Sequence, residues 1–125
     1  MDATDNLRLM ELHCDAWNSH RIERLMALFA EDCVFEAAAG KHAFGERYSG
    51  FDSVKRAFAA IWEAFPDSRW EEAQHVVCGD QGFSEWTFRG TRADGVFVTV
   101  RGVDLLRFKD GKIARKDTFR KAVTA

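Results

Sequence analysis

The chain has 125 residues, of which 46% are hydrophobic and 30% are charged, and its formal net charge is −2 at pH 7. This composition is typical of one globular domain, residues 1–125, long enough to bury a core without disulfides or metal ions. The near-neutral charge argues against a nucleic-acid surface, which would show a basic stripe. No apolar run approaches the roughly 18 residues that a membrane span needs.

Three helices are predicted in the first half of the chain. Apolar residues at helical spacing indicate helices over residues 5–18, 21–29 and about 53–64, the third with Asp52 or Ser53 as its N-cap. The only proline, Pro66, ends the third helix because it cannot donate a backbone hydrogen bond. A short strand is predicted over residues 33–36, between the second and third helices.

The second half of the chain changes character. Four strand-like runs follow, over about residues 69–77, 82–89, 96–108 and 112–121. The short polar breaks between them contain glycine and are typical of hairpins, so neighbouring strands should be antiparallel. The sequence therefore predicts an α+β fold with three N-terminal helices packed on a strongly curved antiparallel sheet. A curved sheet closed by helices encloses a cone-shaped pocket.

Asp104 stands in the middle of the apolar run Val103-Asp104-Leu105-Leu106. A carboxylate without water is costly unless a partner satisfies it. We expect Asp104 to face the pocket, together with Gly102, Leu106 and Phe108 on the same side of its strand. Gly90 and Gly102 interrupt their strands, where the sheet can bend.

The cysteines and the N-terminal residues indicate the compartment. Cys14, Cys33 and Cys78 are odd in number, far apart and match no zinc spacing. Free thiols in a reducing cytoplasm are the simplest interpretation, and residues 1–5 lack a signal-peptide pattern. We therefore predict a cytoplasmic protein without a metal site or cofactor.

Five short segments together resemble the nuclear-transport-factor-like cone fold. This fold is shared by ketosteroid isomerases, SnoaL-like polyketide cyclases and limonene epoxide hydrolases, and the resemblance covers nearly the whole chain. The segments are Ala27-Leu28-Phe29-Ala30-Glu31-Asp32, Tyr48-Ser49-Gly50, Gly90-Thr91, Val103-Asp104-Leu105-Leu106-Arg107-Phe108 and Asp110-Gly111-Lys112-Ile113. The resemblance implies a SnoaL-like cone domain with a small-molecule pocket.

The resemblance also implies which catalytic groups are kept. Asp104 falls where ketosteroid isomerases hold a protonated aspartic acid. In that family the apolar site keeps the carboxyl group neutral, so that it can donate a hydrogen bond. His13 falls where that family has its tyrosine donor, and Ala37 falls where it has its aspartate base. Lys116 and Thr118 fall where the epoxide hydrolases have a tryptophan and an aspartate. No family motif is therefore complete.

The resemblance implies a register for the last strand that turns Lys116, Thr118 and Arg120 inward, into the same pocket as Asp104. We take Asp104, His13 and Lys116 as candidate catalytic residues, because an acid, an imidazole and an amine in an apolar pocket shift one another's pKa values. The candidate ligand-binding residues are Trp17, Phe58, Trp62, Leu106, Thr118 and Arg120. The alternatives are a structural Asp104–Lys116 ion pair, a core role for His13 and the aromatic residues, and a solvated Arg120.

The leading functional hypothesis is a cofactor-independent isomerase, cyclase or hydratase that acts on a small apolar carbonyl compound. A non-catalytic small-molecule binder and a dimerisation module remain alternatives. Bulky residues occupy both faces of the run from Val96 to Arg101, and we assign Phe83, Trp86 and Phe88 to the outer face beside it. A sheet that is apolar on both sides needs a second cover, which predicts a homodimer through the sheet.

Overall fold

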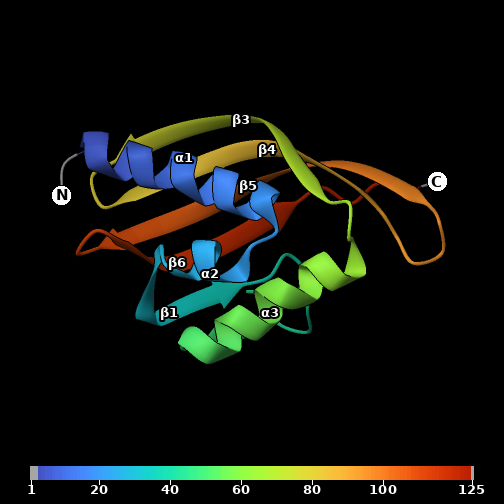
Figure 1. Cartoon of the computed structure of the whole chain (residues 1–125), viewed down its shortest axis with the longest axis horizontal. Helices are drawn as coiled ribbons and strands as arrows, with labels where there is room; N and C mark the ends of the chain where they lie inside the picture. Colours follow the sequence, from blue (N-terminus) through green and yellow to red (C-terminus); the bar gives the residue numbers. More distant parts are fainter. Residues whose placement is uncertain (1–2, 125) are drawn as a thin grey trace.

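The computed structural model describes residues 3–124 as a curved sheet with helices on its concave side (Figure 1). The elements are, in chain order, α1 (Ala3–Ser19), α2 (Ile22–Met26), β1 (Phe29–Glu36), β2 (Arg47–Ser49), α3 (Phe51–Ala64), β3 (Arg69–Cys78), β4 (Gln81–Thr91), β5 (Phe97–Lys109) and β6 (Lys112–Arg120). The predicted α+β class is confirmed. The third helix follows β1, as predicted, and also a second short strand, β2, that was not predicted.

The six strands form one mixed sheet in the order β2-β1-β6-β5-β4-β3. Strands β3 to β6 form the predicted antiparallel meander. The sheet differs from the purely antiparallel expectation at one pair, since β1 joins β6 in parallel with Phe35 opposite Lys116. Parallel neighbours need a long connection, and α3 and three strands of the meander lie between β1 and β6 in the chain.

The second helix is shorter than predicted, and the third begins at Phe51 but ends at Ala64 as predicted. Helix α2 covers only residues 22–26, and Phe29 already belongs to β1. The predicted side-chain cap of α3 was wrong, because Gly50 is its N-cap and no side chain caps the helix. Gly50 has φ +89° and donates its backbone N–H to the carbonyl of Cys33 at 2.8 Å, a conformation that favours glycine.

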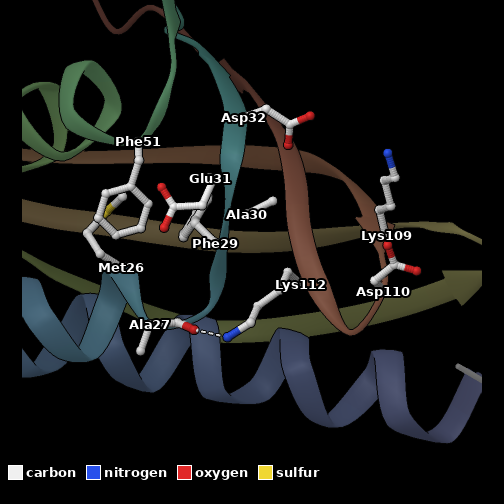
Figure 2. A pocket seen from close by; sticks show the side chains of 10 residues that line it. All are labelled: Met26, Ala27, Phe29, Ala30, Glu31, Asp32, Phe51, Lys109, Asp110 and Lys112. Carbon is white, nitrogen blue, oxygen red and sulfur yellow. Dashed lines mark hydrogen bonds between the residues drawn. The ribbon is translucent and has the colours of Figure 1, made fainter.

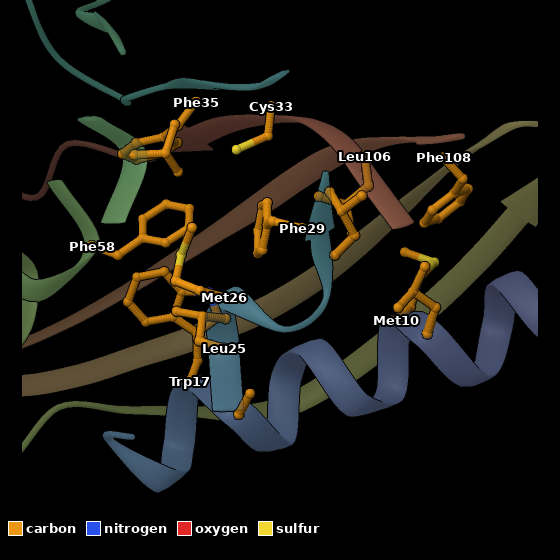
Figure 3. Packing of buried hydrophobic residues seen from close by; sticks show 14 of the residues in the cluster. Met10, Trp17, Leu25, Met26, Phe29, Cys33, Phe35, Phe58, Leu106 and Phe108 are labelled. Carbon is orange, nitrogen blue, oxygen red and sulfur yellow. The ribbon is translucent and has the colours of Figure 1, made fainter. Parts of the chain in front are cut away.

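The hydrophobic core fills the space between the sheet and the helices (Figure 3). Helix α1 packs along β3, and α3 packs against β1 (Figure 1). Phe58 from α3 is fully buried and meets Trp17 from α1 edge to face, with ring centres 4.9 Å apart. Phe58 also meets Phe35 from β1 at 4.9 Å. These aromatic contacts fix both helices on the concave face of the sheet.

The curvature of the sheet depends on a glycine and a bulge. Trp86 and Gly102 are partners across β4 and β5, and a Cβ at Gly102 would overlap the Trp86 indole and lie 2.7 Å from the carbonyl oxygen of Phe119. The absent side chain therefore leaves room for the indole beside β5. On β3 the register shifts between Glu71 and Gln74, where Glu72 has φ +57°. Such bulges increase strand bending.

Two further features bear on the sequence predictions. Cys14, Cys33 and Cys78 are all free thiols. Within residues 3–124, no helix is both long enough and apolar enough to cross a membrane.

Candidate functional site

The inward faces of β5 and β6 bring the candidate polar residues together. Thr118 lies opposite Asp104, Lys116 opposite Leu106, and Arg120 opposite Gly102. Asp104, Leu106 and Lys116 are buried, whereas Phe119 on the other face is 51% exposed. The alternation expected for these two strands therefore holds in the structure.

Asp104 accepts hydrogen bonds from three side chains, one on β4 and two on β6. The donors are Lys116 Nζ at 3.1 Å, Trp86 Nε1 at 3.0 Å and Thr118 Oγ1 at 2.6 Å. Both members of the Asp104–Lys116 ion pair are nearly fully buried, at 2% and 4% exposure. A buried carboxylate held by an ammonium and two neutral donors is fully satisfied.

Lys116 is enclosed by aromatic rings as well as by Asp104. Its Nζ lies 4.7 Å from the centre of the Trp17 ring and 5.8 Å from that of Phe58. Burial lowers the pKa of Lys116 below its ordinary value, and the nearby Asp104 carboxylate opposes that shift only in part. The amine is therefore easier to deprotonate than one in water.

His13 occupies a separate place behind Trp17. Its Nε2 accepts a hydrogen bond from Trp17 Nε1 at 3.1 Å, which assigns the proton of the neutral ring to Nδ1. Burial, aided by the charges of Lys116 and His75, lowers the pKa of His13 well below 6.5. His13 and Asp104 meet only at a void of about 10 Å³. His13 thus fixes the Trp17 indole that covers Lys116.

A cavity of about 340 Å³ opens between α3, β1 and the inner face of the sheet. Its polar lining includes Tyr48, Lys116, Thr118 and Arg120, and the exposed Ala38, Ala39, Ala60, Ala64 and Arg120 form its rim. The volume is within the range of small-molecule sites. The remaining lining residues are aromatic or aliphatic: Trp17, Phe35, Ala37, Ala38, Ala39, Ala57, Ala60, Ile61, Ala64, Phe65, Trp70, Trp86 and Phe88.

The structure divides the predicted site residues between the cavity and the core. Trp17, Lys116, Thr118 and Arg120 line the cavity. Phe58 and Leu106 are fully buried in the core, and Trp62 is 8% exposed beside them. Trp62 Nε1 donates to the Trp17 carbonyl at 3.1 Å, so it holds α1 to α3 instead of facing the cavity. Asp104 lies behind its three donors.

Several lining residues were not predicted. Trp86 and Phe88 were assigned to the outer face, which was wrong, because both are buried on the inner face with Val100. Their alternation with Glu85 and Thr87, and the pairing of Trp86 with a glycine, are the sequence signals that could have indicated the inner face. Ala57, Ala60 and Ala64 of α3 also line the cavity, and no comparable sequence signal indicates them.

A second depression, of about 480 Å³, lies on the surface beside the β5–β6 turn (Figure 2). Its charged residues are all exposed, and Lys112 Nζ donates to the Ala27 carbonyl at 2.7 Å. The depression contains none of the predicted site residues. Among residues 3–124, no cluster of histidine, cysteine and acidic side chains could hold a metal ion. The cavity of about 340 Å³, called the cone cavity from here on, is therefore the candidate site.

The comparison with protein families gives one match over most of the chain. Residues 10–116 match the family model described as a SnoaL-like domain. None of the curated proteins compared with the chain matches it significantly.

Solved structures share the fold. An NTF2-like protein of unknown function from Mesorhizobium loti is 28% identical, with a TM-score of 0.80 over 96% of this chain and 93% of that one. A protein from Xanthomonas campestris pv. campestris, described as a candidate polyketide cyclase, is 16% identical, with a TM-score of 0.83 over 93% and 90%. TerC, co-crystallised with polyporic acid, is 19% identical, with a TM-score of 0.79 over 94% and 92%.

Proposed function

Because the chain belongs to the SnoaL-like domain family, we propose that it is a cofactor-independent isomerase, cyclase or hydratase acting on a small apolar carbonyl compound in the cone cavity. The observation that carries this proposal is the ammonium of Lys116, held by Asp104 at the polar end of an aromatic cavity. The similarity to a candidate polyketide cyclase favours cyclisation among the three reactions.

In this proposal each polar group has a separate role. Lys116 donates a hydrogen bond to the carbonyl oxygen and stabilises the negative charge that develops there. Asp104 is a positioning residue, because its contacts with Trp86 and Thr118 fix the carboxylate that orients Lys116. Arg120 at the rim attracts a ligand that carries an acidic group.

The test follows proton exchange at the α-carbon of an aryl 1,3-diketone in heavy water by NMR. Loss of one oxyanion donor typically lowers a rate by about 10²-fold or more, so Lys116→Met should have this effect. Lys112→Met is the matched control, because Lys112 is exposed and is not among the residues that line the cavity. Equal exchange rates in wild type and Lys116→Met would overturn the proposed role.

A non-catalytic binder is the second candidate, and the lining itself favours it. Ala37 lines the cavity, and no described lining residue carries a carboxylate that could serve as a base. A binder should retain its affinity for the diketone in Asp104→Asn, measured by calorimetry, and should show no exchange above the buffer rate. An enzyme should lose exchange activity in the same variant.

The outer face of the sheet supports a homodimer. Val76, Phe83, Leu105 and Phe119 expose between 39% and 51% of their surface there, and the Glu85–Arg101 ion pair lies on the same face. An apolar face that carries both charges can match a second copy of itself. Sedimentation velocity should show a dimer at micromolar concentration, and Leu105→Glu should dissociate it while Val96→Glu, in the β4–β5 turn, does not. A wild-type monomer would refute the dimer.

The compartment proposed is the cytoplasm. Three unpaired cysteines suit a reducing environment, and Cys33 is fully buried without a partner thiol. Fractionation of cells that produce the tagged chain tests the location, and recovery outside the cytoplasm would refute it.

A further inference from the structure

Lys116 is the one primary amine among the described residues that line the cone cavity. We propose that Lys116 forms an imine with the carbonyl group of an aryl aldehyde or ketone bound in that cavity. The inference rests on the proposed function, since it uses the same cavity and the same ligand class. It replaces the hydrogen bond from Lys116 to the carbonyl oxygen by a covalent bond from Lys116 to the carbonyl carbon.

The surroundings of Lys116 favour nucleophilic attack. An amine attacks a carbonyl carbon only when it is neutral, and a lysine in an apolar pocket is activated in this way. Lys116 is 4% exposed and lies against the ring of Trp17, which also lines the cavity. Asp104 Oδ2 accepts from Nζ at 3.1 Å and can therefore take its proton directly.

The condensation balances with the groups present. The ammonium gives one proton to Asp104, and the free amine forms a C–N bond as the carbonyl π electrons move to oxygen. Asp104 returns that proton to the oxygen, takes a proton from nitrogen and delivers it to the hydroxyl, which leaves as water when the nitrogen lone pair forms the C=N bond. In sum, an ammonium and a carbonyl give an iminium ion and water, and Asp104 is again a carboxylate.

The Thr118 hydroxyl connects Asp104 with the cavity. Thr118 lines the cavity, while its Oγ1 donates to Asp104 Oδ1 at 2.6 Å. A proton can thus pass between the carboxylate, which lies behind the lining, and the departing oxygen inside the cavity. The two oxygens of Asp104 are divided between the two partners, with Oδ2 on Lys116 and Oδ1 on Thr118.

An imine would also explain how the cavity can work without a carboxylate base on its wall. An iminium ion withdraws electrons from the ligand more strongly than a carbonyl does, so the adjacent C–H becomes more acidic. A weak base then suffices to form the enamine. Ala37 lines the cavity as a methyl group, and none of the described lining residues is acidic.

The experiment traps the imine by reduction. The full chain is incubated with 2-naphthaldehyde and sodium cyanoborohydride at neutral pH, and the labelled lysines are identified by peptide mass spectrometry. The naphthylmethyl group should appear on Lys116 several-fold faster than on Lys112, because burial lowers the pKa of the Lys116 amine and so raises its neutral fraction. Equal or slower labelling of Lys116 would overturn the imine.

The variants serve as controls, and the main result does not depend on their folding because it is obtained with the wild-type chain. Lys116→Arg keeps the cation but cannot form an imine, so the fast label should disappear. Lys112→Arg should leave the fast label unchanged, since Lys112 is exposed and outside the cavity. A fast label that persists in Lys116→Arg would overturn the assignment.

Binding is measured separately, through quenching of the tryptophan fluorescence by 2-naphthaldehyde without the reductant. Quenching without a fast label on Lys116 would overturn the imine and leave the proposed function standing. Absence of saturable quenching, with no fast label, would overturn both. Saturable quenching together with the fast label supports both.

Discussion

Replacing Asp104 by leucine should destabilise the fold strongly, because it leaves the buried Lys116 ammonium without its counter-ion. The substitution removes the acceptor of Lys116, Trp86 and Thr118 together. Lys116 is 4% exposed, so little water reaches it to replace the lost partner. Breaking a buried ion pair from one side typically costs about 3–5 kcal/mol, and an unsatisfied indole N–H adds about 1–3 kcal/mol.

Two responses limit that cost. The Thr118 hydroxyl can rotate toward another acceptor, and Lys116 can lose its proton, since burial already lowers its pKa. We therefore expect the free energy of unfolding at pH 7 to fall by about 3–5 kcal/mol rather than by the full sum. This is a large part of the about 5–15 kcal/mol that stabilises a typical domain.

Urea unfolding followed by tryptophan fluorescence measures this loss. The matched control is the double variant Asp104→Leu with Lys116→Met, which removes both charges. It should be more stable than Asp104→Leu alone, and the deviation from additivity should be about 1–3 kcal/mol. A single Asp104→Leu variant that loses less than about 1 kcal/mol would show that the pair is solvated and would refute the reasoning.

Three further predictions concern other buried groups. Burial holds the pKa of His13 well below 6.5, so the unfolded chain takes up a proton at a higher pH than the folded chain does. The free energy of unfolding should therefore fall as the pH drops below 6.5. The variant His13→Gln should show a weaker dependence of this free energy on pH, and an unchanged dependence would contradict the assignment. Burial raises the pKa of Cys33 to about 11, so iodoacetamide at pH 8 should label the exposed Cys78 and spare Cys33, as peptide mapping would show. Gly102→Ala should cost about 1–3 kcal/mol in urea unfolding and weaken ligand binding, because the added Cβ displaces Trp86 from the cavity wall; wild-type stability would exclude the close contact.

The faces of the last two strands could be predicted because side chains alternate with a period of two. That rule places Asp104, Lys116 and Thr118 on one face, and the register of β5 and β6 confirms it. Alternation does not indicate, however, how deeply a side chain is buried below the cavity surface. It cannot indicate that Asp104 lies behind its donors while Lys116 and Thr118 reach the cavity, because depth depends on which side chains from other strands cover it.

The features that could not be predicted all depend on partners distant in the chain. The parallel pairing of Phe35 with Lys116 joins residues that share no local pattern. The inward position of Trp86 depends on the absent side chain of Gly102 on the next strand. The cap of α3 depends on Gly50, whose backbone bonds to β1 and not to the helix alone.

The place of β6 in the sheet also determines the order in which the molecule can assemble during synthesis. Strand β6 is the last of the described strands, yet it lies between β5 and β1, and the residues of β1 leave the ribosome long before those of β6. Until β6 emerges, β1 and its short partner β2 have no neighbour that joins them to the meander. Contacts between such distant segments form late, because the intervening chain must first be ordered. Lys116 arrives on that same strand, so the sheet and the proposed reactive amine are completed in one step.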